Sequence, residues 1–314
     1  MKNTPDISIV VPVYKEEKNI QPFLRRMESV LEPITKHYEI IFCCDPSTDS
    51  TERIICEESN RNPRIQGLIF SRRFGQPAAT MAGLSYCKGN SCVIIDVDLQ
   101  DPPELIGEMY QKFLNGSEVI YAKRKSREGE TLAKKIISFV GYRVINKLSD
   151  VPIPPDTGDF RMISRRVIEE LKSLNESHGY LRGLVAFVGF KQDFIEYDRD
   201  PRLHGVGNYN RFTGSLKIGL NGLISFSTRP LFLMSFIGFI ISGFSFLLGA
   251  WYVIQKLIGM SLSPGLSTTV LTVSFFAGIQ LLGMGLIGEY VGRIYDEVKK
   301  RPMYIVDKKI NIDE

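Results

Sequence analysis

The segment from Ser91 to Glu104 reads SCVIIDVDLQDPPE, and it decides how the rest of the chain is interpreted. A short apolar run ends in three acids, Asp96, Asp98 and Asp101. Such a run is typical of a buried strand, and like charges at its end repel one another unless water or a cation compensates. A solvated turn and a metal site both explain the cluster.

Short apolar strands alternate with helix-patterned segments from residue 7 to residue 122. We expect strands at 7–13, 38–45, 65–71, 91–96 and 118–122. This alternation predicts an α/β fold, with a largely parallel sheet covered by helices. Ligands of such sheets bind beyond the carboxyl ends of the strands. Those ends carry Pro12, Tyr14, Glu16, Asp45, Ser71, Arg72, Asp96, Asp98, Lys123 and Arg124.

The pattern is less regular after residue 122. We expect a basic amphipathic helix at 131–148 and a loop at 150–161, which is rich in proline and aspartate. Helices are predicted at 164–174 and 179–188, and a further strand at 190–198.

The composition narrows the class of protein. The 314 residues include 39 basic and 35 acidic side chains, so no general affinity for nucleic acid is expected. The five cysteines occupy apolar positions without metal-ligand spacing, which predicts reduced core residues. The strand–helix region contains neither the Gly-x-Gly-x-x-Gly motif of dinucleotide-binding folds nor the Gly-x-x-x-x-Gly-Lys-Ser/Thr motif of P-loop enzymes.

Two segments near the C-terminus are long and apolar enough to cross a bilayer. Residues 231–254 carry no formal charge, and residues 266–288 form a second such run. About 20 residues span the hydrocarbon core, so we expect two transmembrane helices rather than a buried core pair. Residues 206–229 place apolar side chains on one side and basic ones elsewhere, which predicts an interfacial helix.

The charges around the apolar runs predict their orientation. Basic residues precede the first run and follow the second, whereas the connecting loop carries only Lys256. The positive-inside rule therefore places both termini in the cytoplasm, and the N-terminal segment lacks the architecture of a signal peptide. The expected parts are a cytosolic domain at 1–205, a juxtamembrane segment at 206–229, two transmembrane helices within 230–290 and a cytosolic tail at 291–314.

Two carboxylates at the end of one strand can share a hard cation. Mg²⁺ or Mn²⁺ binds one or two carboxylates and completes its shell with water and phosphate oxygens. Asp96 and Asp98 therefore indicate a nucleotide diphosphate ligand, although Asp-x-Asp alone is common by chance. Asp45 strengthens this interpretation because it ends a neighbouring strand. Asp101 directly precedes two prolines and is expected to cap the helix that they open.

Four segments carry a resemblance to a known family. They are SIVVPVYKEEKNI (8–20), CCDPSTDST (43–51), IIDVDLQDPPE (94–104) and DTGDFRMISRRV (156–167). Together they resemble family 2 glycosyltransferases, above all the polyprenyl-phosphate sugar transferases, which include bactoprenol glucosyltransferases and dolichol-phosphate mannose synthases. The two apolar runs after this domain are similar to those of the bactoprenol branch. The resemblance implies a Rossmann-like GT-A domain with a mixed sheet, in an integral protein of the bacterial plasma membrane.

The resemblance also implies an activity and a set of site residues. The expected enzyme is an inverting, metal-dependent hexosyltransferase that moves glucose from UDP-glucose to undecaprenyl phosphate. The implied nucleotide-sugar contacts are Pro12, Tyr14, Glu16, Asp45, Asp96 and Val97. The implied ligands of Mg²⁺ or Mn²⁺ are Asp96, Asp98 and Gln100. The chain departs from many relatives at 44–47, where it has Cys-Asp-Pro-Ser in place of Asp-Asp-Gly-Ser, which leaves the donor open.

A lipid-phosphate acceptor brings its own nucleophile, because a phosphate monoester with a second pKa of about 6 is mostly dianionic at neutral pH. It needs cations to hold it near the donor diphosphate. The candidates are Arg124, Lys134, Lys135, Ser138 and Arg202, each of which could equally be a solvated surface residue. Asp159 occupies the family's catalytic-base position. We expect it to orient the reacting groups, and the alternative is a loop carboxylate that caps a helix or pairs with Arg161.

Several alternatives remain open from the sequence. The donor could be GDP-mannose or carry another sugar such as aminoarabinose. A processive polysaccharide synthase is disfavoured, because its Gln-x-x-Arg-Trp motif is missing and the single tryptophan, Trp251, lies in an apolar run. A non-catalytic scaffold that binds nucleotide sugars is disfavoured by the acids at 96, 98 and 159. Gly288 and Gly292 permit close helix contact, which predicts a homo-oligomer.

Overall fold

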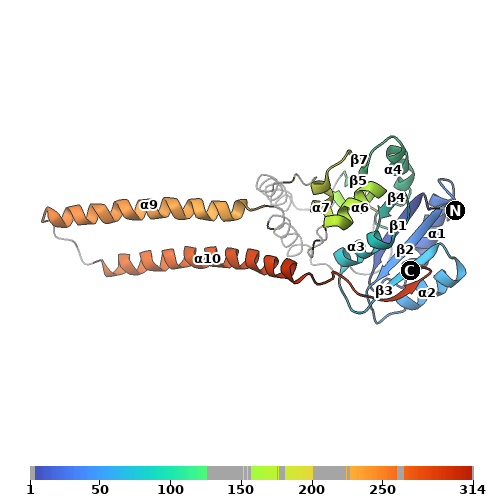
Figure 1. Cartoon of the computed structure of the whole chain (residues 1–314), viewed down its shortest axis with the longest axis horizontal. Coiled ribbons are helices and arrows are strands. Elements are labelled where there is room, and N and C mark those ends of the chain that lie inside the picture. The colour runs from blue at the N-terminus through green and yellow to red at the C-terminus, as the bar shows by residue number, and fades with distance from the viewer. Residues whose placement is uncertain are drawn as a thin grey trace.

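The computed structural model describes residues 4–125, 151, 154, 157–174, 176, 181–200, 224, 227–259 and 265–312. It has an α/β domain at one end, from which two long helices extend side by side (Figure 1). The strands are β1 (Ile7–Val13), β2 (Tyr38–Cys44), β3 (Ile65–Phe70), β4 (Ser91–Ile94), β5 (Val119–Arg124), β6 (Thr157–Ser164), β7 (Gln192–Tyr197) and β8 (Val306–Ile310). The helices are α1 (Ile20–Leu31), α2 (Thr51–Arg61), α3 (Gln76–Tyr86), α4 (Leu105–Leu114), α6 (Arg165–Leu174), α7 (Leu181–Val188), α9 (Arg229–Leu257) and α10 (Leu266–Lys299).

The eight strands form one mixed sheet in the order β7-β5-β6-β4-β1-β2-β3-β8. Strands β1 to β4 pair in parallel, and β5 pairs in parallel with β7. Strand β6 runs antiparallel between β4 and β5, and β8 runs antiparallel to β3. The predicted α/β class and mixed GT-A-like sheet are therefore confirmed. The carboxyl ends of β1, β2 and β4 meet at one edge, as expected for parallel strands.

Strand β6 corrects the prediction of a loop at 150–161, because residues 157–161 belong to it. Phe160 and Met162 pack on one face of the sheet and Ile163 packs on the other. Arg161 also lies on this buried strand and is fully enclosed. The Thr-Gly-Asp start and the buried arginine hide the alternation that identifies a strand from sequence.

Helices cover both faces of the sheet. Helices α1, α2 and α4 place Phe23, Ile55, Ile106 and Met109 in the core on one face. Helices α3, α6 and α7 pack on the opposite face, where the core is also apolar. The predicted helices at 131–148 and 207–227 lie outside the described residues, apart from single positions near the end of the second.

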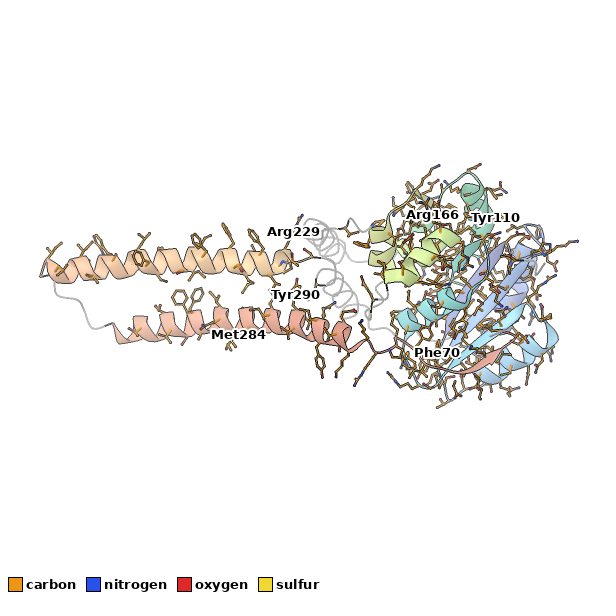
Figure 2. The ribbon with its side chains drawn as sticks, viewed as in Figure 1. Phe70, Tyr110, Arg166, Arg229, Met284 and Tyr290 are labelled. Carbon is orange, nitrogen blue, oxygen red and sulfur yellow. The ribbon has the colours of Figure 1, made fainter. Side chains whose placement is uncertain are left out.

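Helix α9 and the first part of α10, up to Gly288, are apolar all round, and both helices expose large apolar side chains (Figure 2). Residues 229–255 and 272–299 are each long and apolar enough to cross a membrane, and both segments lie outside the packed core. The two helices touch where a Cβ on Gly283 would lie 3.2 Å from the Met234 methyl. Near the domain, the Tyr290 hydroxyl donates a hydrogen bond to the Ser227 carbonyl at 2.7 Å. Exposed apolar surface of this length is typical of helices that lie in a lipid bilayer.

The segment after the second long helix returns to the α/β domain. The sequence predicts a separate tail at 291–314, but α10 continues to Lys299 and β8 then joins the sheet beside β3. The Ser71 amide donates to the Ile305 carbonyl, and the Asn311 amide group donates to the carbonyls of Ser59 and Ile65. The second apolar helix is therefore followed by a strand that belongs to the α/β sheet.

Two helical glycines provide a matched test of this packing. A Cβ on Gly83 would lie 2.3 Å from Val10 Cγ1 and 2.9 Å from Cys43 Sγ, whereas a Cβ on Gly107 would meet only Ile34 Cδ1 at 3.8 Å. We expect Gly83→Ala to lower the melting temperature by about 4 °C or more, because overpacking costs about 1–3 kcal/mol. Gly107→Ala should leave it unchanged or raise it slightly, since alanine favours helix.

The measurement is thermal unfolding of the detergent-purified protein with a thiol-reactive dye. All five cysteines lie in the α/β domain and four of them are buried, so the dye reports that domain alone. Equal melting temperatures for the two variants would contradict the close contact between α3 and β1.

Candidate active site

The loops that follow β1, β2 and β4 bring the predicted donor residues to one edge of the sheet. Asp45 is buried directly after β2, and its two carboxylate oxygens accept the backbone N–H groups of Phe74 and Gly75, both at 2.9 Å. Gly75 has φ +90°, a conformation that favours glycine. Asp45 therefore holds the backbone of the loop after β3 in place.

The loop after β1 is held by hydrogen bonds to the start of α2. The Glu16 amide donates to Thr51 Oγ1 at 3.0 Å, and Glu17 accepts the Ser50 amide at 3.0 Å. Tyr14 follows β1, and the Arg73 guanidinium lies 4.0 Å from the centre of its ring. This stack brings a cation from the loop after β3 onto the loop after β1.

Pro12 and Val97 are buried. Pro12 lies within β1 opposite Cys43, and the Val97 side chain packs in the apolar core. A contact between Val97 and a donor would therefore involve its backbone rather than its side chain.

The three acids after β4 occupy different environments. Asp96 is partly buried and accepts a hydrogen bond from Gln76 Nε2 at 2.8 Å. The Asp98 carboxylate, which is 6% exposed, accepts the Gln100 amide at 3.1 Å. The Gln100 side chain reaches the Asp200 carbonyl at 3.5 Å. Leu99, between Asp98 and Gln100, has φ 58°, the left-handed backbone conformation that residues other than glycine rarely adopt.

Burial, and next the negative charges of Asp101, Asp98 and Asp159, raise the pKa of Asp96 to about 8. Negative charge is therefore concentrated around Asp96, and this concentration would stabilise a bound divalent cation. Among the described residues, no three His, Cys, Asp or Glu side chains form a closed metal-binding group. The carboxylates nevertheless fit a hard cation that completes its shell with substrate phosphate oxygens.

Asp101 does not cap a helix, contrary to the sequence prediction. Helix α4 begins at Leu105, and its N-cap residue, Glu104, makes no capping hydrogen bond through its side chain. Asp101 is instead 2% exposed and accepts a hydrogen bond from the Tyr197 hydroxyl. The guanidinium groups of Arg199 and Arg124 lie 3.6 Å and 3.8 Å from the same oxygen. The two arginines and the hydroxyl explain how this carboxylate is buried.

Asp159 lies in β6 among arginines. Arg182 Nε, at the start of α7, donates to its carboxylate at 2.9 Å, and Arg161 lies 3.7 Å away. Burial disfavours the charged carboxylate, but the charge and hydrogen bond of Arg182 and the charges of Arg161 and Arg124 outweigh burial and lower the pKa of Asp159. Asp159 is therefore ionised at neutral pH and is a weak proton acceptor.

Arg124 ends β5 beside this group. A Cβ on Gly158 would lie 3.1 Å from its NH2 nitrogen, so the guanidinium approaches the backbone next to Asp159. The other predicted acceptor residues, Lys134, Lys135, Ser138 and Arg202, lie outside the described part of the chain. Sequence reasoning missed Arg182, Arg199 and Tyr197, because each meets its partner across a large separation in sequence.

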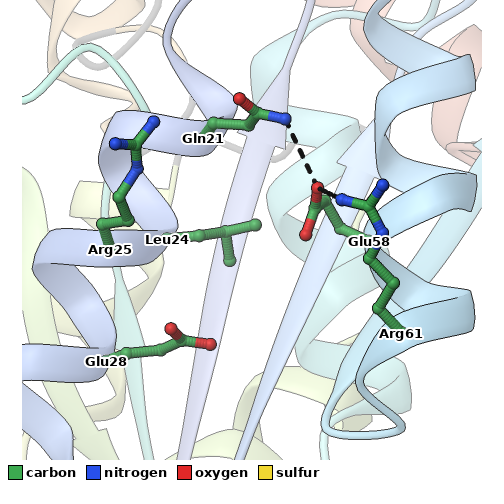
Figure 3. A pocket seen from close by; sticks show the side chains of 6 residues that line it. All are labelled: Gln21, Leu24, Arg25, Glu28, Glu58 and Arg61. Atoms are coloured by element: carbon green, nitrogen blue, oxygen red, sulfur yellow. Dashed lines mark hydrogen bonds and ion pairs between the residues drawn. The ribbon is translucent and has the colours of Figure 1, made fainter.

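A separate shallow pocket of about 230 Å³ lies between α1 and α2. It is lined by Gln21, Leu24, Arg25, Glu28, Glu58 and Arg61 (Figure 3). Glu58 accepts hydrogen bonds from Gln21 and Arg61, so much of its polar lining is internally paired. The pocket is not formed by the loops that carry the acids, and we assign it no role in catalysis.

The mixed α/β sheet, with carboxylates and arginines at the ends of its strands, has the GT-A-like arrangement. Residues 8–172 match the family described as "Glycosyl transferase family 2". The chain belongs to this family.

Named relatives match over almost the full chain. It is 45% identical to "Uncharacterized glycosyltransferase YkcC" of Bacillus subtilis, over 98% of this chain and 94% of that protein. It is 38% identical to the "Bactoprenol glucosyl transferase" of Shigella phage SfII, over 96% of this chain and 97% of that protein. Among solved structures, glucosyl-3-phosphoglycerate synthase from Mycobacterium tuberculosis is 22% identical with a TM-score of 0.48, covering 71% of this chain and 80% of that one.

The arginine beside Asp159 predicts a pH effect. Arg182→Gln removes the largest factor that lowers the pKa of Asp159, so that pKa should rise. We expect the acidic limb of the pH–rate profile for sugar transfer to move to higher pH, with Arg182→Lys intermediate. Arg166→Gln, which removes an exposed arginine that pairs with Glu118, should leave the profile in place. Unchanged acidic limbs in all three variants would exclude ionised Asp159 as an essential group.

Proposed function

We propose that the protein is a membrane-anchored, inverting hexosyltransferase that moves glucose from UDP-glucose to undecaprenyl phosphate or a related polyprenyl phosphate. The observation that carries the proposal is the cluster of four aspartates and four arginines at one end of the sheet, in a domain attached to two apolar helices. The relatives named bactoprenol glucosyl transferase, at 36–38% identity over nearly the whole chain, support it.

In this proposal the donor binds at the ends of β1, β2 and β4. Tyr14, Glu16 and Asp45 would contact the nucleoside, with Pro12 and Val97 shaping the site through the backbone. Asp96 and Asp98, with Gln100 nearby, would hold Mg²⁺ or Mn²⁺. When bound, the cation neutralises charge that develops on the departing diphosphate.

The acceptor phosphate attacks from the opposite side of the sugar. A bond forms between a phosphate oxygen and the anomeric carbon while the bond from that carbon to the donor diphosphate breaks, which inverts the configuration. Arg124 would bind the acceptor phosphate, together with Lys134, Lys135, Ser138 and Arg202 from outside the described residues. A dianionic phosphate carries no proton that must be removed.

Asp159 would act by orientation rather than as a base. Its lowered pKa and its hydrogen bond to Arg182 suit a fixed carboxylate that aligns the sugar or its neighbouring arginines. A carboxylate that stays ionised in this way can stabilise positive charge that develops in the transition state.

The alternatives differ in donor or in class. GDP-mannose and donors of other sugars such as aminoarabinose remain candidates, because the departure at residues 44–47 falls where the base and ribose would bind. A scaffold that binds nucleotide sugars without turnover is the alternative from a different class. The gathering of Asp96, Asp98 and Asp159 at one end of the sheet favours catalysis over a scaffold.

We also propose that residues 1–205 and the tail 291–314 lie in the cytosol, that 206–229 lies at the membrane interface and that 230–290 crosses the membrane twice. Both termini would be cytoplasmic. The apolar lengths of α9 and α10 support this arrangement, as do the basic flanks. Gly288 and Gly292 on α10 have no neighbour within 4 Å of an added Cβ among the described residues, so helices of a second copy could approach there.

Transfer of label from UDP-[¹⁴C]glucose into a lipid-extractable product tests the activity. Purified protein with undecaprenyl phosphate should form the product with Mg²⁺, lose it with EDTA and regain it with Mn²⁺. Asp98→Asn should reduce the rate at least about a hundredfold, as loss of a metal ligand or its partner does. Asp193→Asn, which removes a surface carboxylate paired with Lys112, is the matched control and should retain activity.

Parallel reactions with UDP-galactose, GDP-mannose and a UDP-aminoarabinose donor separate the alternatives. Lipid product formed from one of these donors, and not from UDP-glucose, would change the proposed donor and leave the proposed transferase activity intact. Label that stays water-soluble with every donor would refute the transferase and favour the scaffold.

Accessibility of introduced cysteines tests the topology. Ser263→Cys, between the two helices in the sequence, should react with a membrane-impermeant maleimide in intact cells. Arg61→Cys, at an exposed position in the α/β domain, should react only after the membrane is permeabilised. Labelling of Arg61→Cys in intact cells would contradict a cytosolic catalytic domain.

A further inference from the structure

Asp101 is a buried carboxylate that the proposed reaction does not use directly. It ends the turn that carries Asp96 and Asp98, and only 2% of it is exposed. Its Oδ1 atom receives the Tyr197 hydroxyl and faces the guanidinium groups of Arg199 at 3.6 Å and Arg124 at 3.8 Å. A carboxylate buried this deeply is stable only with such partners, so the four side chains form one arrangement.

The hydrogen bonds in this arrangement run in one direction. Arg124 and Tyr197 are paired at the ends of the parallel strands β5 and β7. Arg124 Nε donates to the Tyr197 hydroxyl oxygen at 3.3 Å, and that hydroxyl donates to Asp101. Burial, then the charge of Asp101, raises the pKa of Tyr197, so the hydroxyl keeps its proton and remains a donor. The Tyr197 ring also packs edge-on against Phe160, the neighbour of Asp159.

Arg199 reaches Asp101 from the loop after β7. The Asp200 amide in this loop donates to the Gln100 carbonyl at 3.0 Å, which attaches the loop to the turn after β4. Arg199 Nε is buried and makes no hydrogen bond within the described residues, and its 3.6 Å approach to Asp101 is an ion pair. The Arg199 side chain is nevertheless 29% exposed, so part of it is accessible to an incoming anion while Nε faces Asp101.

The order of the strands separates this arrangement from the donor residues. Arg124 and Tyr197 lie on β5 and β7 at one side of the sheet, whereas Tyr14 and Asp45 follow β1 and β2 on the other side of β4. Asp101 lies between the two groups. Two anionic substrates that react with each other need separate sets of cations, and the arginines on the β5 side suit the second anion.

We propose that Asp101, held by the Tyr197 hydroxyl, positions the guanidinium groups of Arg124 and Arg199 to bind the phosphate of the lipid acceptor. The inference rests on the proposed function. Asp101 and Tyr197 are positioning residues in this scheme, because they contact the arginines rather than the substrate, and Arg199 becomes a second acceptor-binding arginine beside Arg124.

The test measures initial rates while each substrate is varied in turn, with full-length protein in detergent. Tyr197→Phe removes the hydroxyl that links Arg124 to Asp101 and keeps the ring against Phe160. We expect KM for undecaprenyl phosphate to rise on the order of tenfold and KM for UDP-glucose to stay within about twofold. Asp101→Asn should act in the same direction and more strongly, and Arg199→Lys should retain more acceptor affinity than Arg199→Gln.

Glu196→Gln is the matched control, since Glu196 lies next to Tyr197 on β7 but pairs with the surface residue Lys123. It should leave both KM values unchanged. Dye-monitored unfolding should give Tyr197→Phe a melting temperature close to that of the wild type, which excludes a folding defect. Equal increases in both KM values, or an increase for UDP-glucose alone, would overturn the inference.

Direct binding of farnesyl phosphate distinguishes the positioning role of Tyr197 from the proposed transfer activity. Weaker binding by Tyr197→Phe than by the wild type supports the positioning role even without turnover. Wild-type protein that binds farnesyl phosphate but transfers no label refutes the proposed transfer alone. Equal affinities of the two proteins overturn the positioning role while leaving the transferase proposal intact.

Discussion

Repulsion among four carboxylates at the end of one sheet is the constraint on which the site depends. Each carboxylate is accommodated differently. Asp159 is held ionised by arginines, and Asp101 is buried against a hydroxyl and two guanidinium groups. Asp98 accepts the Gln100 amide, and burial, followed by the charges of the neighbouring carboxylates, raises the pKa of Asp96. Arginines balance the carboxylates on the β5 side of the sheet, while the turn after β4 retains a negative charge that a divalent cation can neutralise.

The strand order of the sheet keeps these two sides apart. Strand β6 runs antiparallel between β4 and β5 and carries Asp159 into the centre of the site. The turn after β4 therefore has the loops after β1 and β2 on one flank and arginines on the other. A reaction between two anions benefits from this geometry, since each can be held by its own charges while the reacting atoms approach.

The sequence predicted the features that arise from local pattern. The parallel strands β1 to β5, their order along the chain and the two long apolar helices follow from hydrophobic periodicity and length. The sequence did not predict the strand at 157–164, because Gly158, Asp159 and Arg161 interrupt its alternation. It also assigned Asp101 to a helix cap, because the prolines that follow it suggested one. Its partner Tyr197 lies 96 residues away, and no local rule connects them.

Strand β8 has a consequence for the order in which the protein is made. The ribosome synthesises the chain from its N-terminus, so the edge of β3 stays open until both apolar helices have been produced. An open sheet edge is a template for pairing with other chains. The last strand closes this edge only after the hairpin is complete, and its Lys308 and Lys309 then occupy the new outer edge. Closure of the α/β sheet is thereby tied to synthesis of the two apolar helices, and a prematurely terminated chain would carry an unprotected edge.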